Sequence, residues 1–168
     1  SSQLTKIKAS DADSLFLPNY YSEVPMQVQQ ARKLGFTGDI VGSDSWGNLE
    51  LITLCGADCE GLFFTTHYAT DIATPKAQAF ISAYQAAYVK MPDDVAALTY
   101  DSFGLLFQAI QAAGKIDRQA VRDALAAITA YEGVTGVMQF KGTGDPIKSA
   151  VIIQIKDGKF TYFTSASP

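Results

Sequence analysis

Two short stretches place aromatic rings, hydroxyls and a carboxylate directly after apolar runs of strand length. Residues 18–23 (PNYYSE) follow the run 14–17, and residues 42–47 (GSDSWG) follow the run 39–41. In open α/β sheets, ligands bind outside the carboxyl ends of the strands. One negative charge beside rings and hydroxyls on such an edge indicates a site for a small zwitterion, and it is not the pattern of an obvious catalytic site.

The rest of the chain offers little catalytic or metal-binding chemistry. His67 is the single histidine, which favours a loop or capping role over a ligand or pH-switch role and excludes a Ser-His-Asp arrangement. The phosphate-binding patterns GxGxxG and GxxxxGK[ST] are both missing. The carboxylates of Asp11, Asp13, Asp93 and Asp94 fit solvated turns and helix ends better than metal ligands. We predict no enzymatic activity, no cofactor and no metal site.

Cys55 and Cys59 are the two cysteines, four residues apart. With one histidine they cannot build a four-ligand structural zinc site, and their CxxxC spacing differs from the redox CxxC motif. They either form a small disulfide loop in an oxidising compartment or stay as two buried thiols at a helix end. The pair is therefore a disulfide candidate.

Composition narrows the class of protein. The 168 residues suffice for a sizeable core, and 48% hydrophobic with 18% charged residues is typical of a folded chain. The formal net charge is −4, with Lys and Arg scattered, so nucleic-acid binding is not expected. No apolar run approaches the roughly 20 residues of a membrane-spanning helix.

The first part of the chain alternates short apolar runs with helical patterns. Strands are predicted at 14–17, 40–41 and 61–66, with helices between them at 22–34 and 48–54. Alternation of this kind predicts a parallel sheet with right-handed crossovers.

The second part is helical at first and ends in strands. Helices are predicted over 75–91, 93–113 and 117–128, with Thr74 and Asp117 as N-caps, and a strand over 134–140. Asp157-Gly158 between two alternating runs predicts a terminal β-hairpin.

The order of these motifs resembles a known family. The pieces are QLTKI (3–7), FLPNYY (16–21), QARKLG (30–35), GSDSW (42–46), EGLFFTT (60–66), ALTYD (97–101), EGVTG (132–136) and GDP (144–146). Together they are similar to the C-terminal half of a periplasmic leucine/isoleucine/valine-type binding protein, the soluble receptor of a branched-chain amino-acid ABC importer.

This resemblance implies an α/β fold of the periplasmic-binding-protein type I, a flavodoxin-like parallel sheet with flanking helices plus the C-terminal hairpin. Residues 1–66 and 149–168 would form the second lobe, and 70–146 the helix-rich part of the first. The N-terminal half of the family is absent from these 168 residues. The helices over 75–128 would then repack, expose apolar faces or pair with the missing half or a second copy.

The resemblance also assigns candidate ligand-binding residues. An acidic residue at the place of Asp44 pairs with the ligand ammonium, whereas the residues alone equally allow Asp44 to cap the next helix. Tyr20 and Tyr21 are adjacent and point oppositely in extended backbone, and the family favours Tyr20 as the ligand-facing ring. Trp46 either walls the pocket or packs on the hinge, and Tyr100 either reaches the cleft or is a core aromatic.

The implied function is an extracytoplasmic solute-binding protein that captures a branched-chain or other apolar amino acid for the membrane permease of an ABC importer. It would act in the periplasm or outside the cell, with a lipid anchor in a Gram-positive organism. Two alternatives remain open: the ligand-sensing lobe of an extracytoplasmic receptor, and a flavodoxin-like enzyme or signalling domain.

Overall fold

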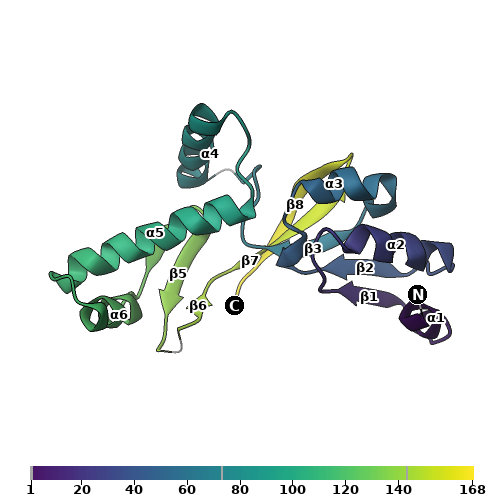
Figure 1. The fold of residues 1–168 in the computed structure, drawn as a ribbon, viewed down its shortest axis with the longest axis horizontal. Helices are drawn as coiled ribbons and strands as arrows, with labels where there is room; N and C mark the ends of the chain where they lie inside the picture. The colour runs from purple at the N-terminus through teal and green to yellow at the C-terminus, as the bar shows by residue number, and fades with distance from the viewer. Residues whose placement is uncertain (1, 73, 143) are drawn as a thin grey trace. The chain divides into compact units, whose positions relative to one another are not determined.

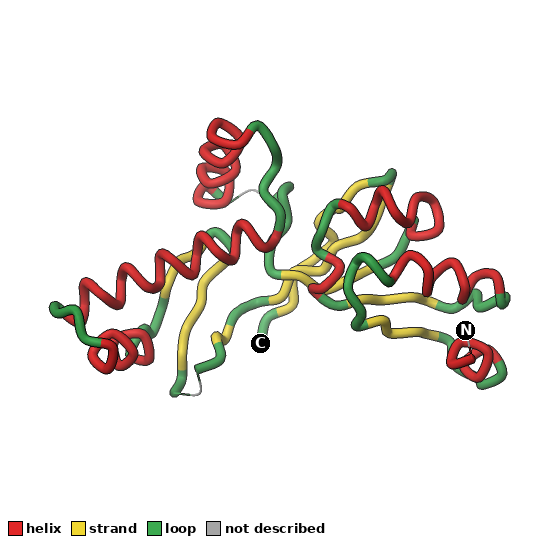
Figure 2. Tube along the Cα trace, in the orientation of Figure 1, coloured by secondary structure: helices red, strands yellow, loops and turns green. Residues whose placement is uncertain are grey.

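The computed structural model describes residues 2–72, 74–142 and 144–168, and the chain divides into two units. Unit 1 comprises Ser1–Ala69 and Val151–Thr164, and unit 2 comprises Thr70–Ala150 and Ser165–Pro168 (Figure 1). Figure 2 shows the alternation of strands and helices in unit 1 and the helix-rich start of unit 2.

Unit 1 is built on a five-stranded mixed sheet of order β1-β2-β3-β7-β8. Strands β1, β2 and β3 run parallel, and β7 adds antiparallel to β3. The elements are α1 (Ser2–Lys8), β1 (Ser14–Leu17), α2 (Val24–Lys33), β2 (Asp39–Gly42), η1 (Asp44–Trp46), α3 (Glu50–Cys55), η2 (Gly56–Cys59), β3 (Phe63–Thr66), β7 (Ala150–Lys156) and β8 (Lys159–Ala166). The predicted parallel sheet is confirmed for these three strands.

The core of unit 1 lies between the sheet and its helices. Helix α2 buries Val24, Val28 and Ala31, spaced three and four residues apart as one face of a helix requires. In the sheet, β7 alternates buried and half-buried residues, with Val151, Ile153 and Ile155 on its covered face. Removing these apolar side chains from water is the main force that holds the unit together.

The terminal hairpin closes with the turn predicted from the Asp-Gly pair. Asp157 and Gly158 both have positive φ, 53° and 65°, as a two-residue hairpin turn of type I′ requires. The Glu60 carboxylate accepts hydrogen bonds from both turn amides, at 2.6 and 3.3 Å. The turn is therefore fixed by its own residues and by the segment that enters β3.

Unit 2 contains three helices followed by a small antiparallel sheet of order β4-β5-β6. Its elements are α4 (Pro75–Tyr88), α5 (Asp94–Ala113), α6 (Arg118–Ala126), β4 (Tyr131–Gly133), β5 (Gly136–Phe140) and β6 (Pro146–Ile147). The predicted caps are present: Thr74 Oγ1 accepts from Ala77 N at 3.3 Å, and Asp117 Oδ1 from Ala120 N at 2.8 Å. Among the described helices, none is long and apolar enough to cross a bilayer.

The structure corrects three local expectations in unit 2. Helix α4 ends at Tyr88, earlier than predicted, because Val89 adopts a left-handed conformation that closes the last turn. The strand predicted over 134–140 is present as β5 but begins at Gly136, because residues 134–135 form the turn from β4. Asp94, expected to be solvated, is buried with 8% of its surface exposed. Thr143, in the predicted turn, lies outside the described residues.

Candidate functional site

The three parallel strands of unit 1 end at one edge of the sheet. Leu17 at the end of β1 pairs with Gly42 at the end of β2, and Gly42 pairs with Phe64 in β3. Residues that follow these ends, including Tyr20, Asp44 and His67, therefore lie on the same edge. We call this edge, made by residues 18–23, 43–47 and 67–68, the strand rim.

Trp46 fastens the strand rim to the strands below it. Its side chain is fully buried, and its indole Nε1 donates a 3.0 Å hydrogen bond to the Leu17 carbonyl at the end of β1. A Cβ atom on Gly42 would lie 2.1 Å from Trp46 Cε2, so the ring lies directly on the backbone of β2. The ring also packs against Phe64 of β3, at 6.0 Å between centroids. One side chain thus contacts all three parallel strands.

Backbone hydrogen bonds fix the short helix η1 that carries Asp44. Trp46 N donates to Ser43 O at 3.1 Å, and Gly47 N donates to Asp44 O at 2.9 Å. Tyr21 N donates to Ser45 O at 3.1 Å, which ties the loop after β1 to the loop after β2. Both loops are therefore held before any ligand arrives.

The carboxylate of Asp44 is free of a capping role. The amide at the start of α3, Glu50 N, donates to Asn48 Oδ1 at 2.8 Å, and the N-cap position itself is held by Leu49, not by Asp44. The Asp44 side chain is 58% exposed on the strand rim, where its Oδ2 lies 3.5 Å from His67 Nε2. A negative charge on this rim is available to a cationic group.

The two adjacent tyrosines are placed differently. Tyr20 is 68% exposed, whereas Tyr21 is half-buried and joined to Ser45 through its amide. The carbonyl of Tyr20 accepts from Glu23 N at 2.9 Å and from Val24 N at 3.2 Å, which turns the chain into α2. The ring of Tyr20 thus stands on a fixed backbone at the strand rim.

Tyr100 belongs to unit 2, on helix α5, and its place in a site with Asp44 stays a prediction. Its ring packs on Phe80 of α4 at 5.0 Å, and 55% of the residue is exposed. It lines a wide groove formed by α4, α5 and the β4 region, with mainly aromatic and small side chains. The groove residues are Lys76, Ala79, Phe80, Ala83, Tyr84, Tyr88, Lys90, Ala96, Thr99, Tyr100, Phe103, Gly104, Phe107, Tyr131 and Val134.

Comparison with known proteins decides the family. The family model described as periplasmic binding protein matches residues 1–159. The chain belongs to the periplasmic binding protein family. Three relatives show which members of the family the chain is similar to. A leucine-, isoleucine-, valine-, threonine- and alanine-binding protein of Pseudomonas aeruginosa is 28% identical over 143 residues, which cover 84% of this chain and 38% of that protein.

Two crystal structures of periplasmic binding proteins match the whole fold. A leucine-binding protein of Thermotoga maritima shares 34% identity at a TM-score of 0.92, covering 99% of this chain and 48% of that one. A branched-chain amino-acid binding protein of Streptococcus pneumoniae, in complex with isoleucine, shares 32% at 0.85, covering 100% and 48%. The chain thus spans about half the length of these relatives.

In this periplasmic binding protein the two cysteines are joined. Cys55 at the end of α3 and Cys59 in η2 form a disulfide across a 5.6 Å Cα separation, and both residues are buried. The cross-link closes the four-residue turn that leads from α3 to β3. It lies in the core of unit 1 and offers no surface-accessible thiol.

Sequence reasoning missed a buried polar cluster in unit 2. The Asp101 side chain is 1% exposed and accepts hydrogen bonds from Val134 N at 2.7 Å, Thr135 N at 2.9 Å and Thr135 Oγ1 at 2.7 Å. Lys148 Nζ donates to Thr135 Oγ1 at 2.7 Å, and burial is the main cause that lowers the pKa of Lys148. The partners are 33 or more residues from Asp101, so no local signal identified them.

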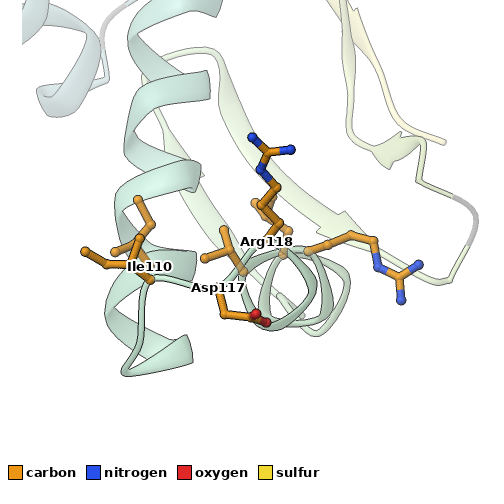
Figure 3. A pocket seen from close by; sticks show the side chains of 7 residues that line it. Ile110, Asp117 and Arg118 are labelled. Atoms are coloured by element: carbon orange, nitrogen blue, oxygen red, sulfur yellow. The ribbon is translucent and has the colours of Figure 1, made fainter.

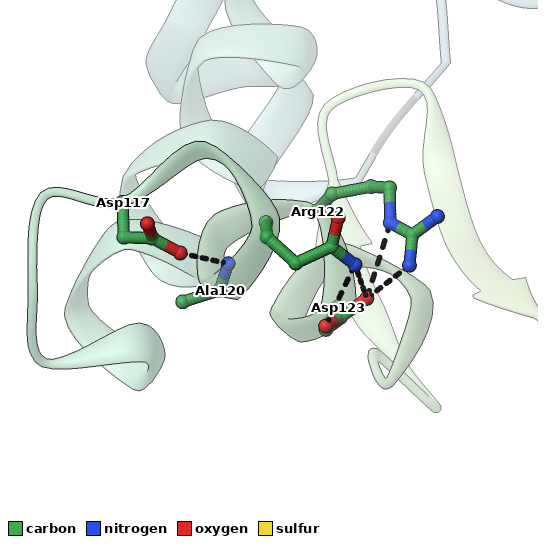
Figure 4. Close-up of polar contacts among 5 residues, drawn as sticks. Asp117, Ala120, Arg122 and Asp123 are labelled. Atoms are coloured by element: carbon green, nitrogen blue, oxygen red, sulfur yellow. Dashed lines mark hydrogen bonds and ion pairs between the residues drawn. The ribbon is translucent and has the colours of Figure 1, made fainter.

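The surface of α6 shows ordinary helix chemistry. Figure 4 shows Asp117 capping the helix at Ala120, and Asp123 accepting from Gln119 and Arg122. The Arg122 bond, then the Gln119 bond, holds the pKa of the exposed Asp123 below its usual value.

A shallow apolar pocket lies between α5 and α6, with Ile110 of α5 and Leu125 of α6 among its lining residues (Figure 3). Within the described residues, no cluster of three His, Cys, Asp or Glu side chains could hold a metal ion.

Proposed function

We propose that this chain supplies half of the binding site of an extracytoplasmic solute-binding protein for an amino acid. In this proposal the Asp44 carboxylate accepts the ammonium group of the ligand, and the ring of Tyr20 borders the side-chain pocket. The observation that carries it is the Asp44 carboxylate, which is 58% exposed on the strand rim of a family member and does not cap a helix. Charge-assisted hydrogen bonds of this type are about twice as strong as neutral ones.

The supporting residues hold this arrangement without all touching the ligand. Trp46 is fully buried, so its contribution is to position η1 and the carboxylate of Asp44 on the strand ends. Tyr21 connects the two loops through its backbone and borders the site with its half-buried ring. We further propose that unit 2 belongs to a second lobe that closes over the ligand, and that Tyr100 contributes its ring from that lobe.

The ligand class is a small amino acid with an apolar side chain. The proteins of Thermotoga maritima and Streptococcus pneumoniae, at 34% and 32% identity, are described as leucine-binding and as bound to isoleucine. The strand rim of this chain offers a negative charge and aromatic surface, which suits an ammonium group and an aliphatic side chain. The ligand carboxylate needs hydrogen-bond donors, which the proposal places outside these 168 residues.

The same proposal accounts for the apolar groove of unit 2. Phe103 and Phe107, which line the groove from one face of α5, are 54% and 59% exposed. Large exposed apolar patches mark surfaces that other protein covers. Relatives about twice as long contain a further half, and we propose that such a half covers this face and completes the binding cleft. The loaded protein would then deliver its ligand to a membrane permease.

Calorimetric titration of the full-length protein with a panel of amino acids tests the function. We expect heat with leucine, isoleucine or valine, and a loss of about tenfold to a hundredfold in affinity for Asp44→Asn. Asp39→Asn, at the opposite end of β2, is the matched control and should bind normally. Absence of heat with every amino acid, while aromatic acids or amides bind, would contradict the proposal. The isolated 168 residues should bind leucine weakly or not at all. Micromolar affinity of these residues alone would contradict the proposal that half of the ligand contacts lie outside them.

A further inference from the structure

His67 lies on the strand rim, and the proposed function assigns it no role. It follows directly after β3, the neighbour of β2 in the parallel part of the sheet, so its backbone meets the same edge as Asp44. Its Nε2 atom lies 3.5 Å from Asp44 Oδ2, and its side chain is 34% exposed. The ring is thus two-thirds covered while one nitrogen points at the carboxylate.

The two ring nitrogens are in different surroundings. Nδ1 is buried and finds no hydrogen-bond partner in the described part of the chain, whereas Nε2 faces Asp44. A buried N–H without an acceptor is costly, so in the neutral ring the proton belongs on Nε2, next to the carboxylate. A second proton would occupy the buried Nδ1, and the ion pair between the resulting imidazolium and Asp44 is what offsets the cost of that unpaired N–H.

We propose that His67 is a specificity-determining residue that competes with the ligand's ammonium group for the carboxylate of Asp44. This inference rests on the proposed function, because it assigns the carboxylate to an ammonium group. With a neutral His67, the pair carries one negative charge and attracts the ammonium. With a protonated His67, the imidazolium neutralises the carboxylate, and the rim loses the charge that selects an amine.

Asp44 is a carboxylate within ion-pair distance of the His67 ring. From η1 comes Asp44 itself, and from β7 the residue paired with Thr66 is the apolar Val151. The loop after β1 carries the phenol side chains of Tyr20 and Tyr21. Tyr68 and Asp71 follow His67 along the chain. A charge change of the imidazole is therefore felt first at the carboxylate 3.5 Å away.

The test is a pH series of leucine affinity in the full-length protein and its His67→Gln variant. L-Leucine is the probe, and the range runs from about pH 5 to about pH 8, over which histidine changes charge and leucine stays a zwitterion. We expect the wild type to lose about tenfold in affinity toward pH 5, equal to about 1.4 kcal/mol. His67→Gln should lose less than about twofold, because a glutamine side chain does not change its charge with pH.

Proton release gives a second readout that does not depend on comparing affinities. A ligand that prefers the neutral ring must expel a proton when it binds at intermediate pH. Calorimetry in buffers of different ionisation enthalpy should detect this release in the wild type and not in His67→Gln. Should His67→Gln fail to fold by circular dichroism, His67→Asn replaces it, and the wild-type release still decides the matter.

The outcomes separate the two proposals. No leucine binding by the wild type at pH 8 refutes the proposed function and this inference with it. Binding at pH 8 with a parallel loss of affinity in wild type and variant, or with no proton release, leaves the proposed function intact and overturns the role of His67.

Discussion

Gly42→Ala tests whether the ring of Trp46 really holds the strand rim. An added Cβ at Gly42 would lie 2.1 Å from Trp46 Cε2 and 2.3 Å from Cδ2, whereas carbon atoms pack at about 3.5–4.0 Å. The ring must therefore move by about 1.4 Å or more away from β2. That movement breaks the 3.0 Å bond from its Nε1 to Leu17 O and shifts η1, which carries Asp44.

The magnitude follows from overpacking in a closed core. The indole is fully buried and rests on Phe64, so it has no space to yield into. Overpacking of this type costs about 1–3 kcal/mol, and the orphaned Leu17 carbonyl adds about 1 kcal/mol. We therefore expect Gly42→Ala to lower the free energy of unfolding by about 3 kcal/mol.

Urea unfolding followed by circular dichroism measures the loss, and a double-mutant cycle identifies its cause. Trp46→Leu removes the ring atoms that the new methyl group meets, so Gly42→Ala should cost less than about 1 kcal/mol in that background. Trp46 is the single tryptophan of the chain, so its fluorescence also reports displacement of the ring. Equal costs in both backgrounds, or an unchanged emission spectrum, would refute the steric argument.

Three further predictions concern the rest of the chain. Asp101→Ala should destabilise the chain by about 3 kcal/mol and expose the Val134 and Thr135 amides to hydrogen exchange, because it leaves buried donors unpaired; Ser102→Ala, beside it on the exposed face of α5, should cost under about 0.5 kcal/mol. Burial lowers the pKa of Lys148 below 10.5, so the unfolded chain binds that proton more tightly, and stability should rise with pH from the lowered value up to 10.5; in Lys148→Met this part of the rise should vanish from denaturation curves. Reduction of Cys55–Cys59 should cost about 2 kcal/mol, and a thiol assay on the unreduced, denatured chain should find no free thiol.

Much of the fold could be predicted because its signals are local. The alternation of short apolar runs with helical spacing predicted the parallel strands β1, β2 and β3, and Asp157-Gly158 predicted the turn of the terminal hairpin. Caps at Thr74 and Asp117 act within three residues of their partners, so the sequence contains the whole interaction. The family could likewise be predicted, because its short motifs occur in this sequence in the same order as in the family.

The errors occurred where distant residues decide. The strand predicted over 134–140 begins two residues later, at Gly136, because Asp101 accepts from the amides of Val134 and Thr135 and holds these two residues in the turn between β4 and β5. Asp94 is buried, although an acidic residue at a helix start is normally solvated. In both cases a carboxylate on helix α5 is buried by residues that are distant in sequence, and the spacing of residues along the chain does not predict such burial.

For the candidate site, the sequence by itself placed Asp44, Tyr20 and Trp46 after the ends of parallel strands, because strand order and loop position follow from the alternating pattern. Tertiary structure alone decided that Trp46 is buried beneath the rim, that Asn48 and not Asp44 accepts from the first amide of α3, and that His67 lies 3.5 Å from the carboxylate. The physical reason is that pairing of β2 with β3 joins residues 22 positions apart, such as Gly42 and Phe64, and the packing of one indole ring on these strands fixes the loops that follow them.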